Sequence, residues 1–163
     1  METGSTMSPN HGTGREAPDE ETARLVRELL EAWNAHDIER IKTFYAPQYE
    51  GVDVGQAEPQ RGPQSMPRNV ERYLQAFPDL RFVEEDIVAK GGRAVLVWKA
   101  YGTHRGRLMN IPPTGRNVVV RGTSVLTVED SKVVRGLYVW DVAGLLRSIG
   151  LLPELKKVNR EVR

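Results

Sequence analysis

Four segments that alternate apolar and polar residues, separated by short turns, follow one another between residues 81 and 140. Alternation with a period of two is typical of strands with one buried face, and we expect strands at about 81–89, 94–104, 117–128 and 132–140. Turn-forming residues stand between neighbouring segments, at Gly91-Gly92 and at Glu129-Asp130-Ser131. Because strands joined by short turns pair antiparallel, this part of the chain predicts an antiparallel meander.

Helical spacing precedes and follows the strands. A first helix is expected from Asp19, where apolar residues recur on one face at Leu25, Val26, Leu29, Leu30 and Trp33. A short second helix is expected from the N-cap Asp37 to Pro47, a third from the cap Ser65 to Pro78, and a last one at 142–149. A short strand is expected near 49–55, and 56–62 is interpreted as polar loop. This order predicts an α+β fold in which a strongly bent antiparallel sheet wraps around helices as a cone with an open mouth.

Composition narrows the class of protein. With 163 residues and no internal repeat, one domain is expected at 19–155, between a disordered tail at 1–18 and a charged tail at 156–163. The net charge of +1 provides no electrostatic attraction for nucleic acid or an anionic membrane. Disulfides, thiolate nucleophiles and cysteine metal sites are excluded because the chain has no cysteine. No apolar run approaches the roughly 20 residues that span a bilayer, and no signal segment is recognised, so we expect a cytoplasmic protein.

Several short motifs, taken in order, resemble one family. They are Glu31-Ala32-Trp33-Asn34, Tyr45-Ala46-Pro47, Tyr101-Gly102-Thr103-His104-Arg105-Gly106, Pro112-Pro113-Thr114-Gly115-Arg116, and Trp140-Asp141 with Leu145-Leu146-Arg147-Ser148-Ile149-Gly150. Over about residues 20–152 the chain resembles the SnoaL-like polyketide cyclases, within the nuclear-transport-factor-2-like (NTF2-like) α+β barrels. The resemblance implies a cone-shaped barrel with an internal apolar pocket. It also implies a ring-closing aldol reaction that needs neither a metal nor an organic cofactor.

The resemblance places the acid–base positions of that family on different residue types here. Its aspartate falls on Tyr138, its two pocket histidines fall on Gly136 and Ser124, and its glutamine falls on Gly122; its asparagine falls at about Gly51. The fold motifs are therefore retained, whereas the side chains of the aldol cyclase are replaced.

Three residues are candidates for catalysis, each with a structural alternative. Tyr138 would share a strand face with Gly136 and Trp140 and could donate a hydrogen bond to a developing enolate; the alternative is an aromatic core residue. His104 could carry a proton, or it could hold the following loop by hydrogen bonds. Asp141 could be an acid, or it could cap the last helix.

The sequence offers several carboxylates as the catalytic base and does not choose between them. At least one of Glu84, Glu85 and Asp86 has to share the face of Phe82. An inward carboxylate there, or Asp53, would be a candidate base. Five large side chains could form either the core or a substrate pocket: Trp33, Phe77, Trp98, Met109 and Trp140. The resemblance also places Ser124 inside the barrel.

Two functional hypotheses follow. The first is a cofactor-independent pocket enzyme that moves a proton at carbon in a small apolar, oxygenated molecule, by cyclisation or isomerisation. The second is a non-catalytic ligand-binding or interaction module on the same fold. A third possibility beside these two is a structural dimer whose pocket has collapsed. We expect no metal, no cofactor, no nucleic acid and no membrane partner, and a homodimer formed through the outer face of the sheet.

Overall fold

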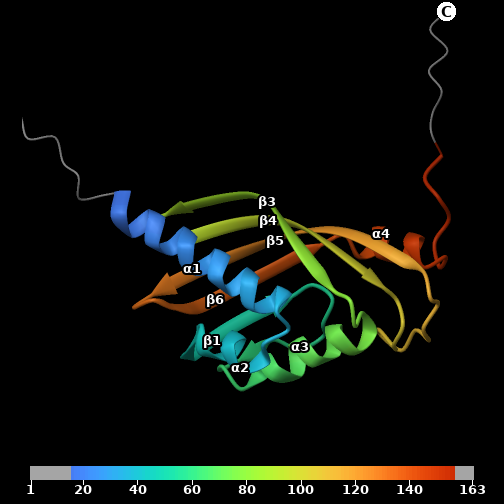
Figure 1. Ribbon diagram of the computed structural model, residues 1–163, viewed down its shortest axis with the longest axis horizontal. Coiled ribbons are helices and arrows are strands. Elements are labelled where there is room, and N and C mark those ends of the chain that lie inside the picture. The colour runs from blue at the N-terminus through green and yellow to red at the C-terminus, as the bar shows by residue number, and fades with distance from the viewer. Residues whose placement is uncertain (1–15, 157–163) are drawn as a thin grey trace, which may run out of the picture.

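The computed structural model describes residues 16–156 (Figure 1). Four helices are present in this range: α1 (Glu16–Asn34), α2 (Ile38–Thr43), α3 (Ser65–Ala76) and α4 (Val142–Ser148). The strands are β1 (Tyr45–Asp53), β2 (Gln60–Arg61), β3 (Arg81–Lys90), β4 (Arg93–Thr103), β5 (Asn117–Glu129) and β6 (Lys132–Trp140). The predicted tails lie largely outside the described residues.

One six-stranded sheet has the order β2-β1-β6-β5-β4-β3. Strands β3 to β6 form the predicted antiparallel meander, whereas β1 pairs parallel to β6. The long strands bend over α1, and α2 and α3 lie below them beside β1 (Figure 1). The predicted α+β architecture of a bent sheet wrapped around helices is thereby confirmed.

Several predicted boundaries are corrected. The first helix begins at Glu16, before the predicted Asp19, and α2 ends at Thr43, so that Pro47 lies within β1 instead of ending the helix. The segment 56–62 is not all loop, because β2 pairs antiparallel with β1. Ser65 is the first residue of α3 and its hydroxyl donates to the carbonyl of Gly62, so it does not act as the helix cap.

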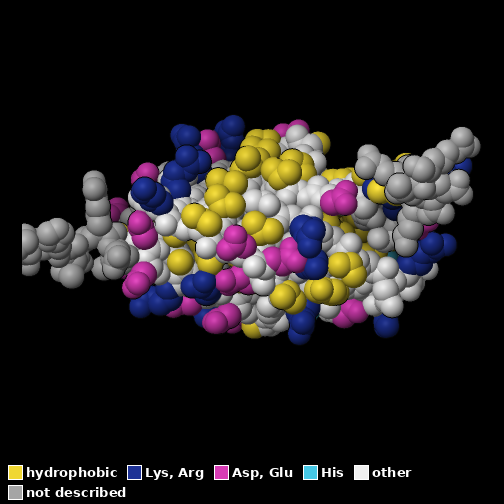
Figure 2. Space-filling model, turned by 90° about the horizontal axis from the view of Figure 1, so that it is seen from above, with side chains coloured by type: hydrophobic (Ala, Val, Ile, Leu, Met, Phe, Trp, Pro, Cys, Tyr) yellow, Lys and Arg dark blue, Asp and Glu magenta, His cyan; other side chains and the backbone are white. Residues whose placement is uncertain are grey.

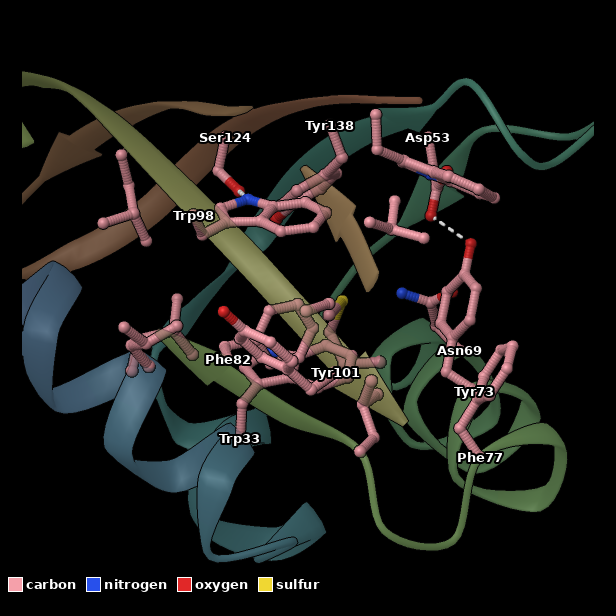
Figure 3. A pocket seen from close by; sticks show the side chains of 18 of the residues that line it. Trp33, Asp53, Asn69, Tyr73, Phe77, Phe82, Trp98, Tyr101, Ser124 and Tyr138 are labelled. Atoms are coloured by element: carbon pink, nitrogen blue, oxygen red, sulfur yellow. Dashed lines mark hydrogen bonds between the residues drawn. The ribbon is translucent and has the colours of Figure 1, made fainter. Parts of the chain in front are cut away.

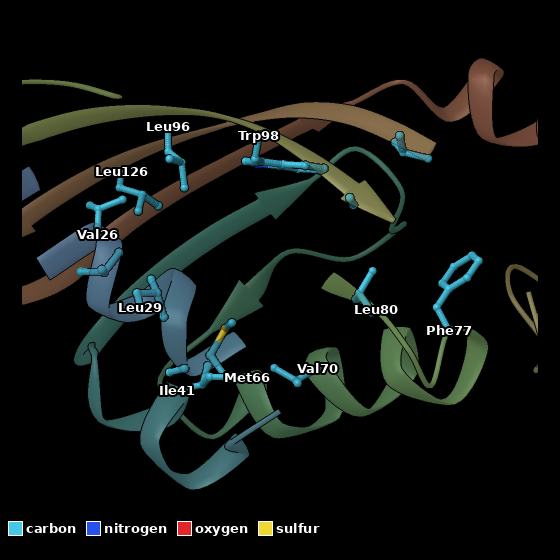
Figure 4. Packing of buried hydrophobic residues seen from close by; sticks show 14 of the residues in the cluster. Val26, Leu29, Ile41, Met66, Val70, Phe77, Leu80, Leu96, Trp98 and Leu126 are labelled. Atoms are coloured by element: carbon cyan, nitrogen blue, oxygen red, sulfur yellow. The ribbon is translucent and has the colours of Figure 1, made fainter. Parts of the chain in front are cut away.

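The apolar core joins the helices to the concave face of the sheet (Figure 4). Val26 and Leu29 of α1 are buried with Leu96 of β4 and Leu126 of β5. Because full burial of one such side chain stabilises the fold by about 1.5–3 kcal/mol, the predicted apolar face of α1 is a main source of stability. Beneath it, α2 and α3 contribute Ile41, Met66 and Val70.

No helix in the described part of the chain is both long and apolar enough to cross a membrane.

Candidate active site

An internal cavity lies between the concave face of the sheet, α1 and α3 (Figure 3). Its volume open to the centres of water molecules is about 130 Å³, whereas a single water needs roughly 10–15 Å³ by this measure. The cavity can therefore hold an organic molecule. Most of its lining is aliphatic or aromatic, and the predicted site residues in the lining are Trp33, Phe77, Trp98, Ser124, Tyr138 and Trp140.

Asp53, the last residue of β1, is the carboxylate in the cavity wall. It is only 5% exposed and accepts four hydrogen bonds. Tyr73 of α3 donates its hydroxyl over 2.7 Å (Figure 3), and the indole N–H of Trp140 donates over 2.8 Å. The backbone N–H of Gly55 and the amide of Gln56 complete the set, at 2.8 and 3.1 Å. Three separate parts of the fold thus converge on one buried carboxyl group.

Burial and the charge of Asp53 together raise the pKa of Tyr73 above its usual value. Tyr73 therefore stays protonated at neutral pH and serves as a donor to the carboxylate. The side-chain amide of Gln56 also donates to the side-chain oxygen of Asn69. Asn69 therefore adds a second polar side chain to the cavity lining beside Asp53. The Asp53 side of the cavity is thus the polar end of an otherwise apolar space.

A cluster of phenol groups forms a second polar feature beside it. The Tyr138 hydroxyl lies 3.0 Å from that of Tyr49 and 3.4 Å from that of Tyr45, and Tyr49 donates to Gln60 over 3.0 Å. Tyr45 and Tyr138 line the cavity. Burial raises the pKa of Tyr45 to about 12, and burial with the neighbouring phenols raises the pKa of Tyr138 well above its usual value. These hydroxyls are therefore neutral hydrogen-bonding groups near pH 7, not bases.

Two glycines make room for the phenols. Gly51 and Gly136 are directly paired between β1 and β6. A Cβ atom at position 136 would lie 2.7 Å from the Tyr138 hydroxyl oxygen, and one at position 51 would collide with the hydroxyl of Tyr49. The two hydroxyls thus occupy the space above this glycine pair. At both positions the resemblance had placed polar side chains of the cyclases, and tyrosines fill that space here.

Aromatic rings form the remaining wall. Phe82 of β3 packs edge-on against Trp33 of α1 and Trp98 of β4, with ring centroids 5.6 and 5.1 Å apart. Trp98 donates its indole N–H to the Ser124 hydroxyl over 3.0 Å. A side chain at Gly122, the cross-strand partner of Trp98, would collide with that indole. Such a wall suits a flat, apolar ring system.

Three predicted site residues lie outside the cavity lining. His104 is fully buried, and its imidazole Nδ1 lies 3.1 Å from the Thr114 hydroxyl in the following loop. Burial lowers the pKa of His104 below its usual value. Asp141 accepts the backbone N–H of Gly144 over 2.7 Å as the N-cap of α4, and Met109 is 40% exposed. These positions match the structural alternatives for His104 and Asp141.

The charged run on β3 does not reach the cavity lining. Strand alternation turns the consecutive side chains of Glu84 and Glu85 to opposite faces of the sheet. Glu84 pairs with Arg27 of α1 at 3.0 Å, whereas Glu85 binds Arg121 and Lys99 at 2.6 and 2.9 Å. The inward carboxylate is instead that of Asp53, whose alternation with Tyr49 and Gly51 in β1 was the signal for it. The role of Tyr73 was missed because its helical spacing indicates only an apolar face, and the role of Asn69 was missed because no motif marks it.

The bent sheet, the helices it encloses and the cavity between them define an α+β barrel of the NTF2-like class. A sequence profile of the SnoaL-like polyketide cyclase family matches residues 23–149, and the chain belongs to this family, as its motifs predicted.

Curated relatives and solved structures that are similar to this chain include the following three. The aklanonic acid methyl ester cyclase DauD of Streptomyces sp. (strain C5) is 29% identical over 129 residues, which are 77% of this chain and 80% of DauD. The aklanonic acid methyl ester cyclase DnrD of Streptomyces peucetius is also 29% identical over 129 residues, which are 77% of this chain and 88% of DnrD. The crystal structure of AclR from Streptomyces galilaeus superposes with a TM-score of 0.76 at 30% identity, covering 86% of this chain and 91% of AclR.

Proposed function

We propose that this chain is a cofactor-independent enzyme that moves a proton at a carbon atom beside a carbonyl group of a polyketide-like or other cyclic, largely apolar substrate. The observation that supports this most strongly is the buried carboxylate of Asp53 in the wall of an aromatic cavity. The names of the two curated relatives, both cyclases of aklanonic acid methyl ester, support a substrate of this class.

In this proposal Asp53 takes a proton from the carbon atom, and the negative charge moves to the carbonyl oxygen. Tyr138 donates a hydrogen bond to that oxygen, where a donor stabilises the developing charge most. The two residues are direct cross-strand partners on β1 and β6, so their side chains leave neighbouring positions on the same face. The proton then returns to a different carbon in an isomerisation, or to the new alkoxide in a ring closure.

The test compares Asp53→Asn with wild type on aklanonic acid methyl ester in D2O. Product is followed by chromatography, and deuterium uptake beside the carbonyl groups by mass spectrometry. Because general base catalysis contributes about 10²–10⁴-fold, we expect Asp53→Asn to lose at least about a hundredfold in both. Asp86→Asn, the same change at an exposed position of β3, should retain the wild-type rate. A wild-type rate in Asp53→Asn would remove Asp53 from the reaction.

The second candidate function is a non-catalytic binding module. It is favoured by Tyr138, which stands where the resemblance places the cyclase aspartate. In that case wild type would bind the ester and protect it from solvent, but would release no product and exchange no deuterium.

We also propose a homodimer formed through the outer face of the sheet. Cross-strand pairing joins Val52, Leu137, Val125, Val95 and Val88 in one row over five strands. Val52 is 52% exposed and Leu137 is 42% exposed, and hydrophobic side chains gather between charged ones on the molecular surface (Figure 2). Light scattering should give the mass of a dimer for wild type and of a monomer for Leu137→Arg. A wild-type monomer at micromolar concentration would contradict this proposal.

A further inference from the structure

Gln60 of β2 ends the chain of hydroxyl groups that includes Tyr138. It is only 4% exposed, and its side-chain oxygen accepts from Tyr49 over 3.0 Å. Its amide nitrogen has no hydrogen-bond partner among the described residues. An unpaired buried amide is unusual in a native fold, and it stands next to the groups that contact the cavity.

The direction of the hydrogen bonds at Gln60 determines what Tyr138 can do. When the Tyr49 hydroxyl donates to the Gln60 oxygen, it can only accept from Tyr138. The Tyr138 hydroxyl then donates its hydrogen bond to Tyr49. Tyr138 can then only accept hydrogen bonds from the cavity. In this direction the site suits a ligand hydroxyl, not a carbonyl.

Reversal of the Gln60 amide inverts the chain. The amide N–H then donates to Tyr49, Tyr49 donates to Tyr138 and the Tyr138 proton becomes free for a ligand carbonyl. Tyr45 competes weakly for that proton, because its oxygen is 3.4 Å away. Either direction leaves part of the amide without a partner among the described residues, so neither excludes the other and a ligand can select between them.

We propose that Gln60 is a positioning residue that sets whether Tyr138 donates to the cavity or accepts from it. This inference rests on the proposed function, in which Tyr138 binds a carbonyl oxygen. A reversible chain suits such a reaction, because the substrate carbonyl needs a donor, whereas an enol or alcohol formed from it needs an acceptor. Gln60 itself lies outside the cavity lining and acts only through Tyr49.

The experiment measures binding, so its outcome does not depend on turnover. The probes are 1-tetralone and tetralin, which differ in one carbonyl group, and binding is followed at pH 8 by the fluorescence of the tryptophans that line the cavity, Trp33, Trp98 and Trp140. The quantity compared is the ratio of the two affinities. Tetralin reports the shape of the cavity, and the ratio reports the hydrogen bond to the carbonyl.

Two substitutions at Gln60 should act in opposite directions. Gln60→Glu, when ionised, can only accept, so it holds the chain in the direction that consumes the Tyr138 proton. We expect its tetralone-to-tetralin ratio to fall about fivefold, as in Tyr138→Phe, because one neutral hydrogen bond is lost. Gln60→Met frees Tyr49 to donate to Tyr138, and its ratio should equal or exceed that of wild type. Gln75→Glu, the same change at an exposed position of α3, should leave the ratio unchanged.

The outcomes separate this inference from the proposed function. If the tetralone-to-tetralin ratio falls in Tyr138→Phe but not in Gln60→Glu, the inference is overturned and Tyr138 remains the donor to the carbonyl. An unchanged ratio in both variants, or no binding of tetralone to wild type, would overturn both roles. If Gln60→Glu loses affinity for tetralin and tetralone equally, the shape of the cavity has changed, and this result would also contradict the inference. If Gln60→Glu does not fold, a reduced ratio in Gln60→Met gives the same refutation.

Discussion

Replacement of Asp53 by alanine and by asparagine should separate the stabilising hydrogen bonds of this carboxylate from the cost of burying it. Alanine removes the acceptor for Tyr73, Trp140 and Gly55, whereas Gln56 keeps a partner in Asn69. At about 1 kcal/mol for each of the three orphaned donors, Asp53→Ala should lower the free energy of unfolding by about 3 kcal/mol.

Asparagine should cost less. Its side-chain oxygen can still accept from Trp140 and Gly55, and its amino group can donate to the Tyr73 hydroxyl once that hydroxyl rotates. As in the alanine variant, Gln56 keeps a partner in Asn69, but the O–H of Tyr73 loses its acceptor, so Asp53→Asn should lower the free energy of unfolding by about 1 kcal/mol. Urea unfolding, with the two variants and wild type compared at a common slope, measures the expected gap of about 2 kcal/mol.

The opposite order would refute this reasoning. If Asp53→Ala were as stable as wild type or more stable, the free-energy cost of desolvating the carboxylate would exceed the stabilisation from its four hydrogen bonds. Asp53 would then be a group kept at the expense of stability.

Two further outcomes are expected. Because burial lowers the pKa of His104, the unfolded chain binds more protons than the folded chain just below pH 6.5. The free energy of unfolding of wild type should therefore fall as the pH is lowered from 7 towards 5, and His104→Gln should lack this slope. Urea titrations at half-unit pH steps measure this change in the free energy of unfolding. Glu85 does not interfere, because its pKa is lowered from 4.5 to about 2 and the group titrates only below this pH range. Gly136→Ala should cost about 1–3 kcal/mol by pressing on Tyr138, and a variant as stable as wild type would show that the phenol can move aside at no cost.

Local patterns predicted the meander and the four helices, because alternation and helical spacing depend on residues that are close along the chain. The parallel pairing of β1 with β6 was not predicted, since it joins positions as distant as Asp53 and Tyr138 and leaves no local signal. The two-residue strand β2 is too short for any periodicity.

The site follows the same division. Tyr138 and Trp140 were placed on one face by strand parity alone, and both line the cavity. The convergence on Asp53 could not be predicted, because its donors Tyr73 and Trp140 lie 20 and 87 residues away in the sequence. Which carboxylate points inward is decided by such long-range packing, and the sequence alone left Asp53 open.

The parallel pairing of β1 with β6 also has a consequence for biosynthesis. The cross-strand partners Asp53 and Tyr138 meet only when β6 pairs with β1, so a nascent chain that still lacks residues 132–140 lacks the part of the pocket that carries Tyr138. Because contacts so distant along the chain form slowly, assembly of the site is expected to be the final step of maturation. A small molecule that contacts both Asp53 and Tyr138 would then bind only after β6 has joined the sheet.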